Sequence, residues 1–168
     1  MRRFVGITLV IVTALVLQST VFSELRLFGV RPELMFLVTI LLALLGGPSE
    51  GAIVGFVSGM AQDFMLNQPK GITALTLTLL GYGVGMTRQY IVSPSPLVPT
   101  AVVFIGTLAG TVFYVVVAYL LGAYDGTAAF AGRVALLAAV YNAVLTPIVY
   151  PLLRRVTEGP RSRRVVRV

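Results

Sequence analysis

Long apolar stretches separated by short polar ones dominate this chain. The polar breaks carry turn signals such as Gly-Gly-Pro, Asn-Gln-Pro and Asp-Gly. A helix rises about 1.5 Å per residue, so about 20 apolar residues cross a bilayer. The pattern predicts an all-α, polytopic integral membrane bundle with about six transmembrane spans. The predicted spans are residues 4–22, 32–47, 49–66, 72–90, 100–124 and 133–153; they lie in one domain, 1–155, followed by a basic tail, 156–168.

The second predicted span is short, because its uncharged core is limited to residues 34–45. Such a stretch forms either a short span shielded by other helices or half of a re-entrant hairpin with the third stretch. We favour the short span, because a strong turn signal follows it at 46–50. In that turn, Pro48 suits the first position of a helix, and Glu50 falls in the first turn, where the helix dipole favours an anion.

The third span carries small residues at a fixed spacing. Gly51, Gly55, Gly59 and Asp63 recur every fourth residue, which places them in one narrow stripe along a helix. Small residues at this spacing let helix backbones approach closely in lipid. The stripe therefore predicts either packing inside the bundle, which we favour, or a surface for a partner helix. The pair formed by Gly106 and Gly110 on the fifth span is the rival docking face.

Asp63 is an acidic residue at the end of an apolar stretch, and three interpretations are open. It caps a helix or pairs with a cation, it holds a ligand or partner, or it acts as a catalytic acid. The first and the partner-binding roles are favoured because the residue lies near the helix end. Arg31 is the predicted ion-pair partner, because the topology places both residues at the outer face.

The sixth span contains polar and helix-disturbing residues. Asn142 and Thr146 lie one turn apart and are predicted to form hydrogen bonds with another span. Pro147 is predicted to kink the helix. A further proline-rich segment, 92–99, predicts an extended connection before the fifth span.

The composition agrees with a membrane protein, since 57% of the residues are apolar and 11% are charged. The mean hydropathy is +0.94. The chain has no Cys and no His, which excludes thiolate and imidazole metal sites, Cys nucleophiles and His-based triads. An aspartyl hydrolase needs two carboxylates in one site, and Asp125 is explained by a turn. We therefore predict no enzyme activity, no metal and no cofactor.

The net charge of +7 is concentrated on one side of the predicted bundle. Nine of the thirteen basic residues fall on the side that holds both chain ends. The positive-inside rule then places both ends in the cytoplasm. The basic tail predicts attraction to anionic lipids rather than binding of nucleic acid, with contact to a cytoplasmic partner as the alternative.

Several short motifs, taken in order, point to a known family. The motifs are Leu17-Gln18-Ser19-Thr20, Arg31-Pro32-Glu33, Gly51, Gly55-Phe56, Gly59, Gln62-Asp63, Pro69, Gly71, Ala74-Leu75, Asn142, Pro147 and Arg154-Arg155. Together they resemble MreD, the bacterial rod shape-determining membrane protein family, over nearly the whole chain.

The resemblance implies a function. MreD is a small polytopic subunit, without known catalysis, of the machinery that elongates the lateral cell wall in the bacterial cytoplasmic membrane. It binds MreC, a single-span protein with a large outer domain. Through MreC it acts on the RodA glycosyltransferase and its class B penicillin-binding transpeptidase, coordinated by actin-like MreB. The resemblance also implies a fold similar to the substrate-binding subunits of energy-coupling-factor transporters.

A transporter-type subunit that binds a small hydrophilic molecule is the main alternative. It predicts a polar, aromatic-lined outer cavity. Subunits of that kind also dock their energising module through an Ala-xxx-Ala face on the first span. Here Gly6, Val10, Ala14 and Gln18 occupy that spacing, so the docking face is missing.

Overall fold

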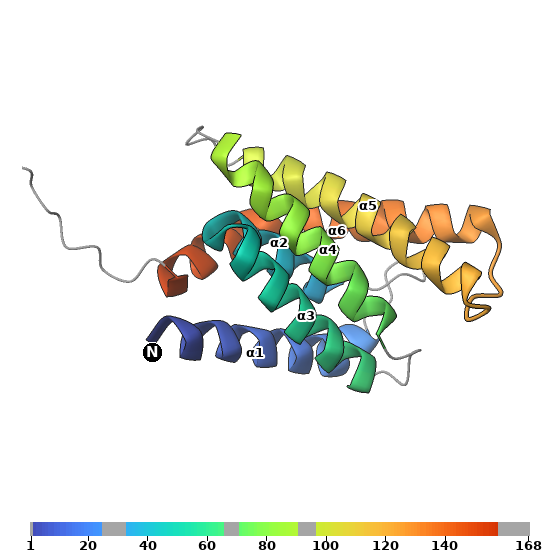
Figure 1. Ribbon diagram of the computed structural model, residues 1–168, viewed down its shortest axis with the longest axis horizontal. Coiled ribbons are helices and arrows are strands. Elements are labelled where there is room, and N and C mark those ends of the chain that lie inside the picture. The colour runs from blue at the N-terminus through green and yellow to red at the C-terminus, as the bar shows by residue number, and fades with distance from the viewer. Residues whose placement is uncertain (1, 25–32, 66–70, 91–96, 158–168) are drawn as a thin grey trace, which may run out of the picture.

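The computed structural model describes residues 2–24, 33–65, 71–90 and 97–157, and all the regular elements in these ranges are helical (Figure 1). The predicted all-α class is thereby confirmed. The elements are α1 (Arg2–Glu24), α2 (Leu34–Gly46), α3 (Pro48–Met65), α4 (Ile72–Thr87), the 3-10 helix η1 (Arg88–Tyr90), α5 (Leu97–Leu120) and α6 (Ala128–Thr157).

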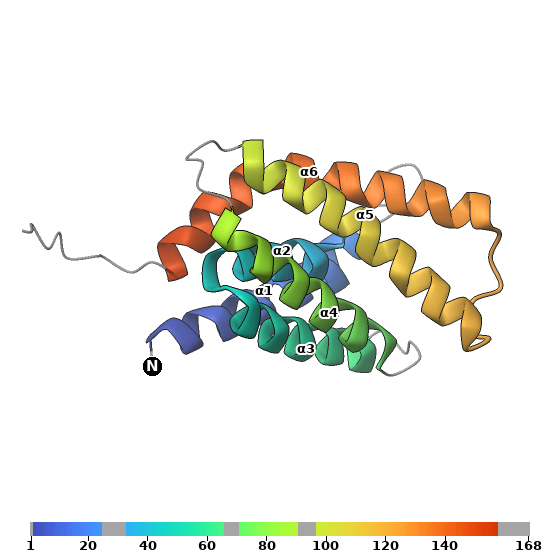
Figure 2. The same cartoon turned by 45° about the horizontal axis from the view of Figure 1, so that its top comes forward.

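Helix α2 lies at the centre of the bundle and contacts each of the other five α-helices. Helices α3 and α4 form the most extensive pair, and α5 and α6 form the second. Figure 2 shows α5 and α6 on one side of α2 and α1 and α3 on the other. The bundle is therefore built from two helical pairs and the single helix α1 around a buried central helix.

The central position of α2 follows from its composition. Apart from Thr39 and Gly46, all its residues are apolar, and a helix that is apolar all round belongs in an interior. All residues from Leu34 to Ala43 are buried. At 13 residues the helix is about 20 Å long, so its neighbours extend beyond it. The hydroxyls of Thr39 and Ser58 lie 3.1 Å apart and connect α2 to α3.

A tight turn joins α2 to α3 where the sequence predicted one. Gly47 has φ = 94°, a conformation that favours glycine, and its N–H donates to the Ala43 carbonyl at 2.8 Å. Pro48 is the first residue of α3 and Glu50 lies in its first turn, so both predictions are confirmed.

The last two helices differ from the predicted spans at their ends. The predicted extended connection is wrong at Leu97 and Pro99, which belong to α5. Proline fits the first turn of a helix, where its missing N–H has no intrahelical partner. Helix α5 ends at Leu120, before the turn at Gly122, and α6 begins at Ala128 rather than at residue 133.

Helix α6 contains Pro147 and Pro151 and continues through both to Thr157. Its last turns bend toward α1 (Figures 1 and 2), as expected for a helix containing prolines. A Cβ atom at Gly6 would lie 2.7 Å from the Val156 side chain. The start of α1 and the end of α6 therefore lie at the same end of the bundle.

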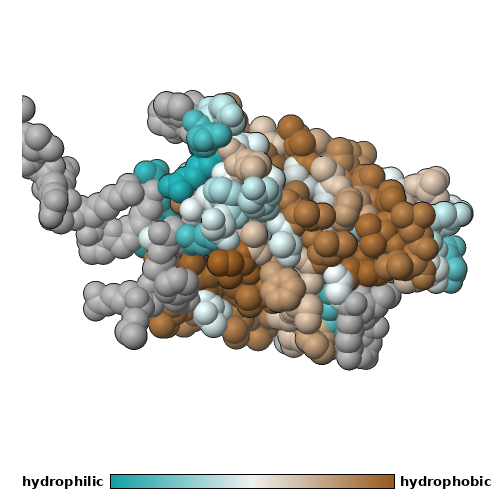
Figure 3. Space-filling model, in the orientation of Figure 1, coloured by the Kyte–Doolittle hydropathy of each residue, from teal (hydrophilic) through white to brown (hydrophobic). Residues whose placement is uncertain are grey.

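The surface is apolar around the middle of the bundle and more polar at that end (Figure 3). Among the described residues, α5 and α6 are long and apolar enough to cross a membrane, and Val5–Thr20 and Leu34–Gly46 are shorter apolar helical segments. Arg88 closes α4, and Arg154 and Arg155 lie in the last turns of α6.

Candidate functional site

The glycine stripe of α3 faces α4. A Cβ atom on Gly51, Gly55 or Gly59 would come closer than 3.0 Å to backbone atoms of α4. On the α4 side, Gly81 and Gly85 meet the backbones of Gly51 and of the turn before α3 in the same way. We call these five residues the glycine seam. It brings two backbones together without intervening side chains, which is how helices pack closely in lipid.

The second predicted small-residue pair also lies inside the bundle. A Cβ atom on Gly106 would approach the Ile40 side chain at 3.0 Å, and one on Gly110 would approach the Phe36 ring at 2.6 Å. Both neighbours belong to the central helix α2. In this structure, therefore, neither small-residue stripe is free to receive a helix from another protein.

Asp63 caps the N-terminus of α4. Its Oδ2 accepts the Gly71 N–H at 2.8 Å and the Ala74 N–H at 3.2 Å, and its side chain is fully buried. Gly71, with φ = 102°, allows the chain to turn into α4 at this point. A carboxylate here satisfies two N–H groups that lack partners within the helix and interacts favourably with the helix dipole.

Two amide side chains make similar connections around the start of α2. Gln18 on α1 accepts the Met35 N–H through Oε1 at 3.2 Å. Asn142 on α6 donates through Nδ2 to the Glu33 carbonyl at 3.1 Å and to the Thr107 hydroxyl at 3.2 Å. Asn142 thus connects α6 to α5 and to the residue before α2, as predicted for a bond to another span. Thr146, in contrast, donates to the carbonyl of Asn142 in its own helix.

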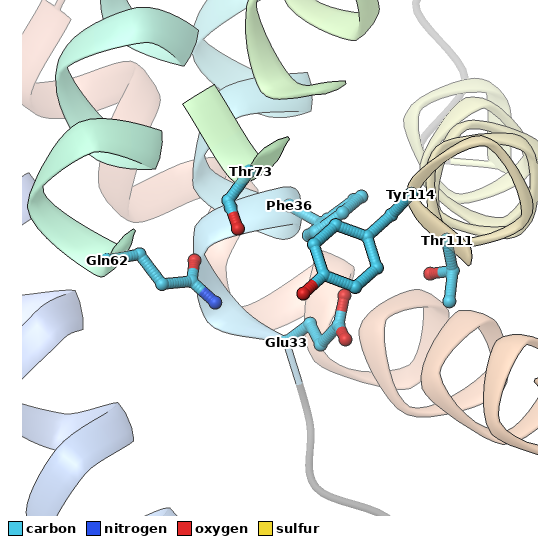
Figure 4. Close-up of a pocket in the computed structure, with 6 residues that line it drawn as sticks. All are labelled: Glu33, Phe36, Gln62, Thr73, Thr111 and Tyr114. Atoms are coloured by element: carbon cyan, nitrogen blue, oxygen red, sulfur yellow. The ribbon is translucent and has the colours of Figure 1, made fainter. Parts of the chain in front are cut away.

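A small polar cavity lies among the ends of these helices (Figure 4). Its volume is about 70 Å³. Gln62 and Thr73 reach it from α3 and α4, Thr111 and Tyr114 from α5, and Glu33 from the residue before α2 (Figure 4). Phe36 completes the lining. Three lining oxygens, Glu33 Oε2, Gln62 Oε1 and Thr111 Oγ1, are buried and have no hydrogen-bond partner in the described part of the chain.

A larger apolar groove separates α1 from α3. Its volume is about 500 Å³. The two helices contact each other sparingly, so side chains of both remain accessible along the groove. Ile53 on α3 is 62% exposed and Val57 is 49% exposed. The lining residues are Ile7, Thr8, Ile11, Ser49, Glu50, Ile53, Val54 and Val57.

The structure brings some of the predicted site residues together and separates others. Asp63 and Gly71 meet at the α3–α4 turn, whereas Pro147 lies on α6 among exposed residues. Arg31 and Pro32 lie outside the described residues, so the pairing of Arg31 with Asp63 stays a prediction.

Most of the cavity residues have no recognisable role in the sequence pattern. Thr111 and Tyr114 follow Glu33 by 78 and 81 positions in the chain, and only the packing of α5 on α2 brings them together. Gln62 gave a weak signal, since it is a polar residue on the buried side of an apolar helix. Gln18 belonged to a recognised motif, but nothing in the sequence identified Met35 as its partner.

Close backbone contacts, buried polar connections at helix ends and long apolar helices together define a class, the helical membrane bundles. A family model described as rod shape-determining protein MreD matches residues 1–156. The chain therefore belongs to the MreD family, a membrane protein family that functions in determining rod shape. No curated protein and no solved structure matches the chain, and similarity to energy-coupling-factor subunits stays a prediction.

Proposed function

We propose that this protein is a non-enzymatic membrane scaffold that regulates lateral cell-wall elongation by binding MreC. MreC then connects it to the RodA–class B penicillin-binding protein synthase that makes peptidoglycan, and to MreB. Membership of the MreD family supports a role in rod shape. The groove between α1 and α3 is the observation that carries the binding proposal.

The groove suits one transmembrane helix of a partner. It runs beside α3 from Ser49 to Val57, which is about two helical turns. Its walls are mostly aliphatic, so a partner helix would replace lipid with close-packed side chains, and packing is what drives helices together in a bilayer. Both glycine faces that could have received such a helix are already filled by α4 and α2. The groove is a concave apolar face with a volume of about 500 Å³ that no helix of the described chain fills.

We further propose that the chain crosses the bacterial cytoplasmic membrane several times, with both termini in the cytoplasm. The start of α1 and the ends of α4 and α6 lie at one end of the bundle (Figure 1). Arg88 follows the last residue of α4, and Arg154 and Arg155 lie in the last turn of α6. Arg133 lies near the start of α6, toward the other end. This asymmetry follows the positive-inside rule and supports attraction of the basic tail to anionic lipids.

The transporter alternative is less well supported. The cavity of Figure 4 has the polar and aromatic lining that this alternative predicts. Its volume of about 70 Å³, however, is well below the roughly 300–1,000 Å³ of sites for small organic ligands. A vitamin-sized molecule does not fit this space.

Purification from the native membrane in mild detergent tests the proposal. We expect MreC to be recovered with the protein in a fixed ratio, without nucleotide-binding subunits. Recovery of nucleotide-binding subunits or of a bound vitamin, with MreC absent, would support the transporter instead.

Matched variants test the groove itself. Ile53→Trp fills the groove, whereas Ile105→Trp adds the same bulk to an equally exposed position on α5; the two side chains are 62% and 64% exposed. We expect Ile53→Trp to reduce MreC recovery and rod shape, while Ile105→Trp leaves both unchanged. Equal recovery of MreC with both variants would refute the groove as its docking site. Lipid would then be the expected occupant of the groove.

A further inference from the structure

The polar cavity of Figure 4 contains more hydrogen-bond acceptors than the described chain satisfies. Glu33 Oε2 and Gln62 Oε1 line it, are buried, and accept no hydrogen bond. Thr111 Oγ1, from the opposite wall, is also buried without a partner. Asp63, the residue after Gln62, has a second carboxylate oxygen, Oδ1, in the same condition. Buried polar atoms in native proteins are almost always paired, so this cluster indicates a missing donor.

A positively charged donor would match the carboxyl groups near the cavity. Glu33 and Asp63 bring two carboxyl groups to this end of the bundle, and none of the six residues that line the cavity is basic. A buried carboxylate is stable only when it is paired or hydrogen-bonded. Two N–H groups of α4 already partly compensate Asp63. Glu33 has no such contact at Oε2.

The cavity is also small. About 70 Å³ corresponds to roughly two water molecules at their share of liquid volume. The structure contains no group of three or more His, Cys, Asp or Glu among the described residues, which disfavours a divalent metal. A guanidinium or ammonium head fits the size, the charge and the need for several donors.

We propose that this cavity is a binding site for one guanidinium or primary ammonium group. The group donates to Glu33 Oε2, Gln62 Oε1 and Thr111 Oγ1, and the rings of Phe36 and Tyr114 close the space around it. Aromatic faces also attract cations, which adds to the selectivity for this charge. The proposal does not depend on the groove, which is lined by different residues.

Thermal unfolding of the full chain in mild detergent tests the site, with methylguanidinium chloride as the probe. Tetramethylammonium chloride at the same concentration is the control, because it carries the same charge but donates no hydrogen bonds. We expect methylguanidinium to give a saturable rise in Tm of about 3 °C at ten times its dissociation constant. No rise, or the same rise with tetramethylammonium, would overturn the proposal.

Substitutions that nearly preserve side-chain shape test whether the probe binds in the cavity or at the surface. Glu33→Gln removes the negative charge and replaces one carboxylate oxygen by an NH2 group, and Thr111→Val removes the hydroxyl; we expect each to abolish or strongly reduce the rise. Asp125→Asn makes the charge change of Glu33→Gln in an exposed turn and should keep the full rise. If Glu33→Gln does not fold, Thr111→Val still decides the question. A rise retained in Thr111→Val, or lost in Asp125→Asn, would contradict the assignment.

A second titration identifies the source of the natural group. It uses the protein recovered together with its membrane partners. A loss of the methylguanidinium effect there would show that a basic side chain of a partner occupies the cavity. A retained effect would assign the site to a dissolved amine or guanidine, and either result supports a site for this chemical group.

Discussion

Two glycines in neighbouring helices make opposite predictions for the same substitution. Gly55 lies in the glycine seam, where a Cβ atom would come 2.9 Å from the Thr78 amide nitrogen and closer still to the carbonyl group of Leu77. Gly83 lies on the exposed side of α4, where a Cβ atom would meet nothing within 4 Å. Replacing each by Ala therefore adds the same methyl group in two different surroundings.

The expected magnitudes follow from these surroundings. In both helices Ala is favoured over Gly by about 1 kcal/mol because it restricts the unfolded chain. At Gly55 the methyl group meets backbone atoms, which cannot rotate away, so α3 and α4 must separate. Overpacking of this kind costs about 1–3 kcal/mol, and the fixed backbone places Gly55 at the upper end. We expect a net loss of about 2 kcal/mol for Gly55→Ala and a gain of about 0.5–1 kcal/mol for Gly83→Ala.

Far-UV circular dichroism on the purified variants in one detergent measures both effects. For a chain of this size, 1 kcal/mol shifts Tm by about 2–4 °C. Gly55→Ala should therefore lower Tm by about 4–8 °C, and Gly83→Ala should raise it slightly. The reasoning is refuted if Gly55→Ala is as stable as Gly83→Ala, because α3 would then tolerate a side chain at its contact with α4.

Three further predictions concern the polar connections and the seam. Asp63→Ala should lower the free energy of unfolding by about 1–2 kcal/mol and speed hydrogen exchange most at the start of α4. The control, Asp125→Ala in the exposed turn, should change it by less than about 0.5 kcal/mol. Equal effects of the two substitutions would contradict the capping role of Asp63. A double-mutant cycle with Asn142→Leu and Thr107→Val should give a coupling of about 0.6 kcal/mol, and strict additivity would exclude a bond between them. Gly55→Leu should abolish folding or MreC recovery, and wild-type abundance with full MreC binding would contradict a contact at that position.

The sequence predicted helix contacts best where small residues recur at a fixed spacing. Gly51, Gly55 and Gly59 at a four-residue spacing marked a close helix contact, but many helices satisfy that pattern. The short connection after α3 brings α4 back along the same face, so the hairpin supplies the partner. The sequence alone left open whether the stripe meets its own chain or another protein.

Two kinds of feature could not be predicted from the sequence: the exact helix ends and the polar cavity. The start of α5 differs from the prediction because Pro99 is harmless in the first turn of a helix, and α6 begins at Ala128, before the predicted start at residue 133. The cavity is formed by residues from four separate segments, and its polar side chains have individually ordinary sequence contexts. Their convergence depends on how α5 packs on α2, which no local pattern encodes.

Site-specific photo-crosslinking in living cells tests the central claim most directly, namely that α1 and α3 present a groove to a single-span partner while the glycine seam stays inside the chain. A photoreactive amino acid is placed at Ile53 in one variant and at Ile105 in another. The account predicts that the probe at Ile53 crosslinks to the transmembrane segment of MreC and that the probe at Ile105 does not. MreC crosslinked from Ile105, with none from Ile53, would contradict it.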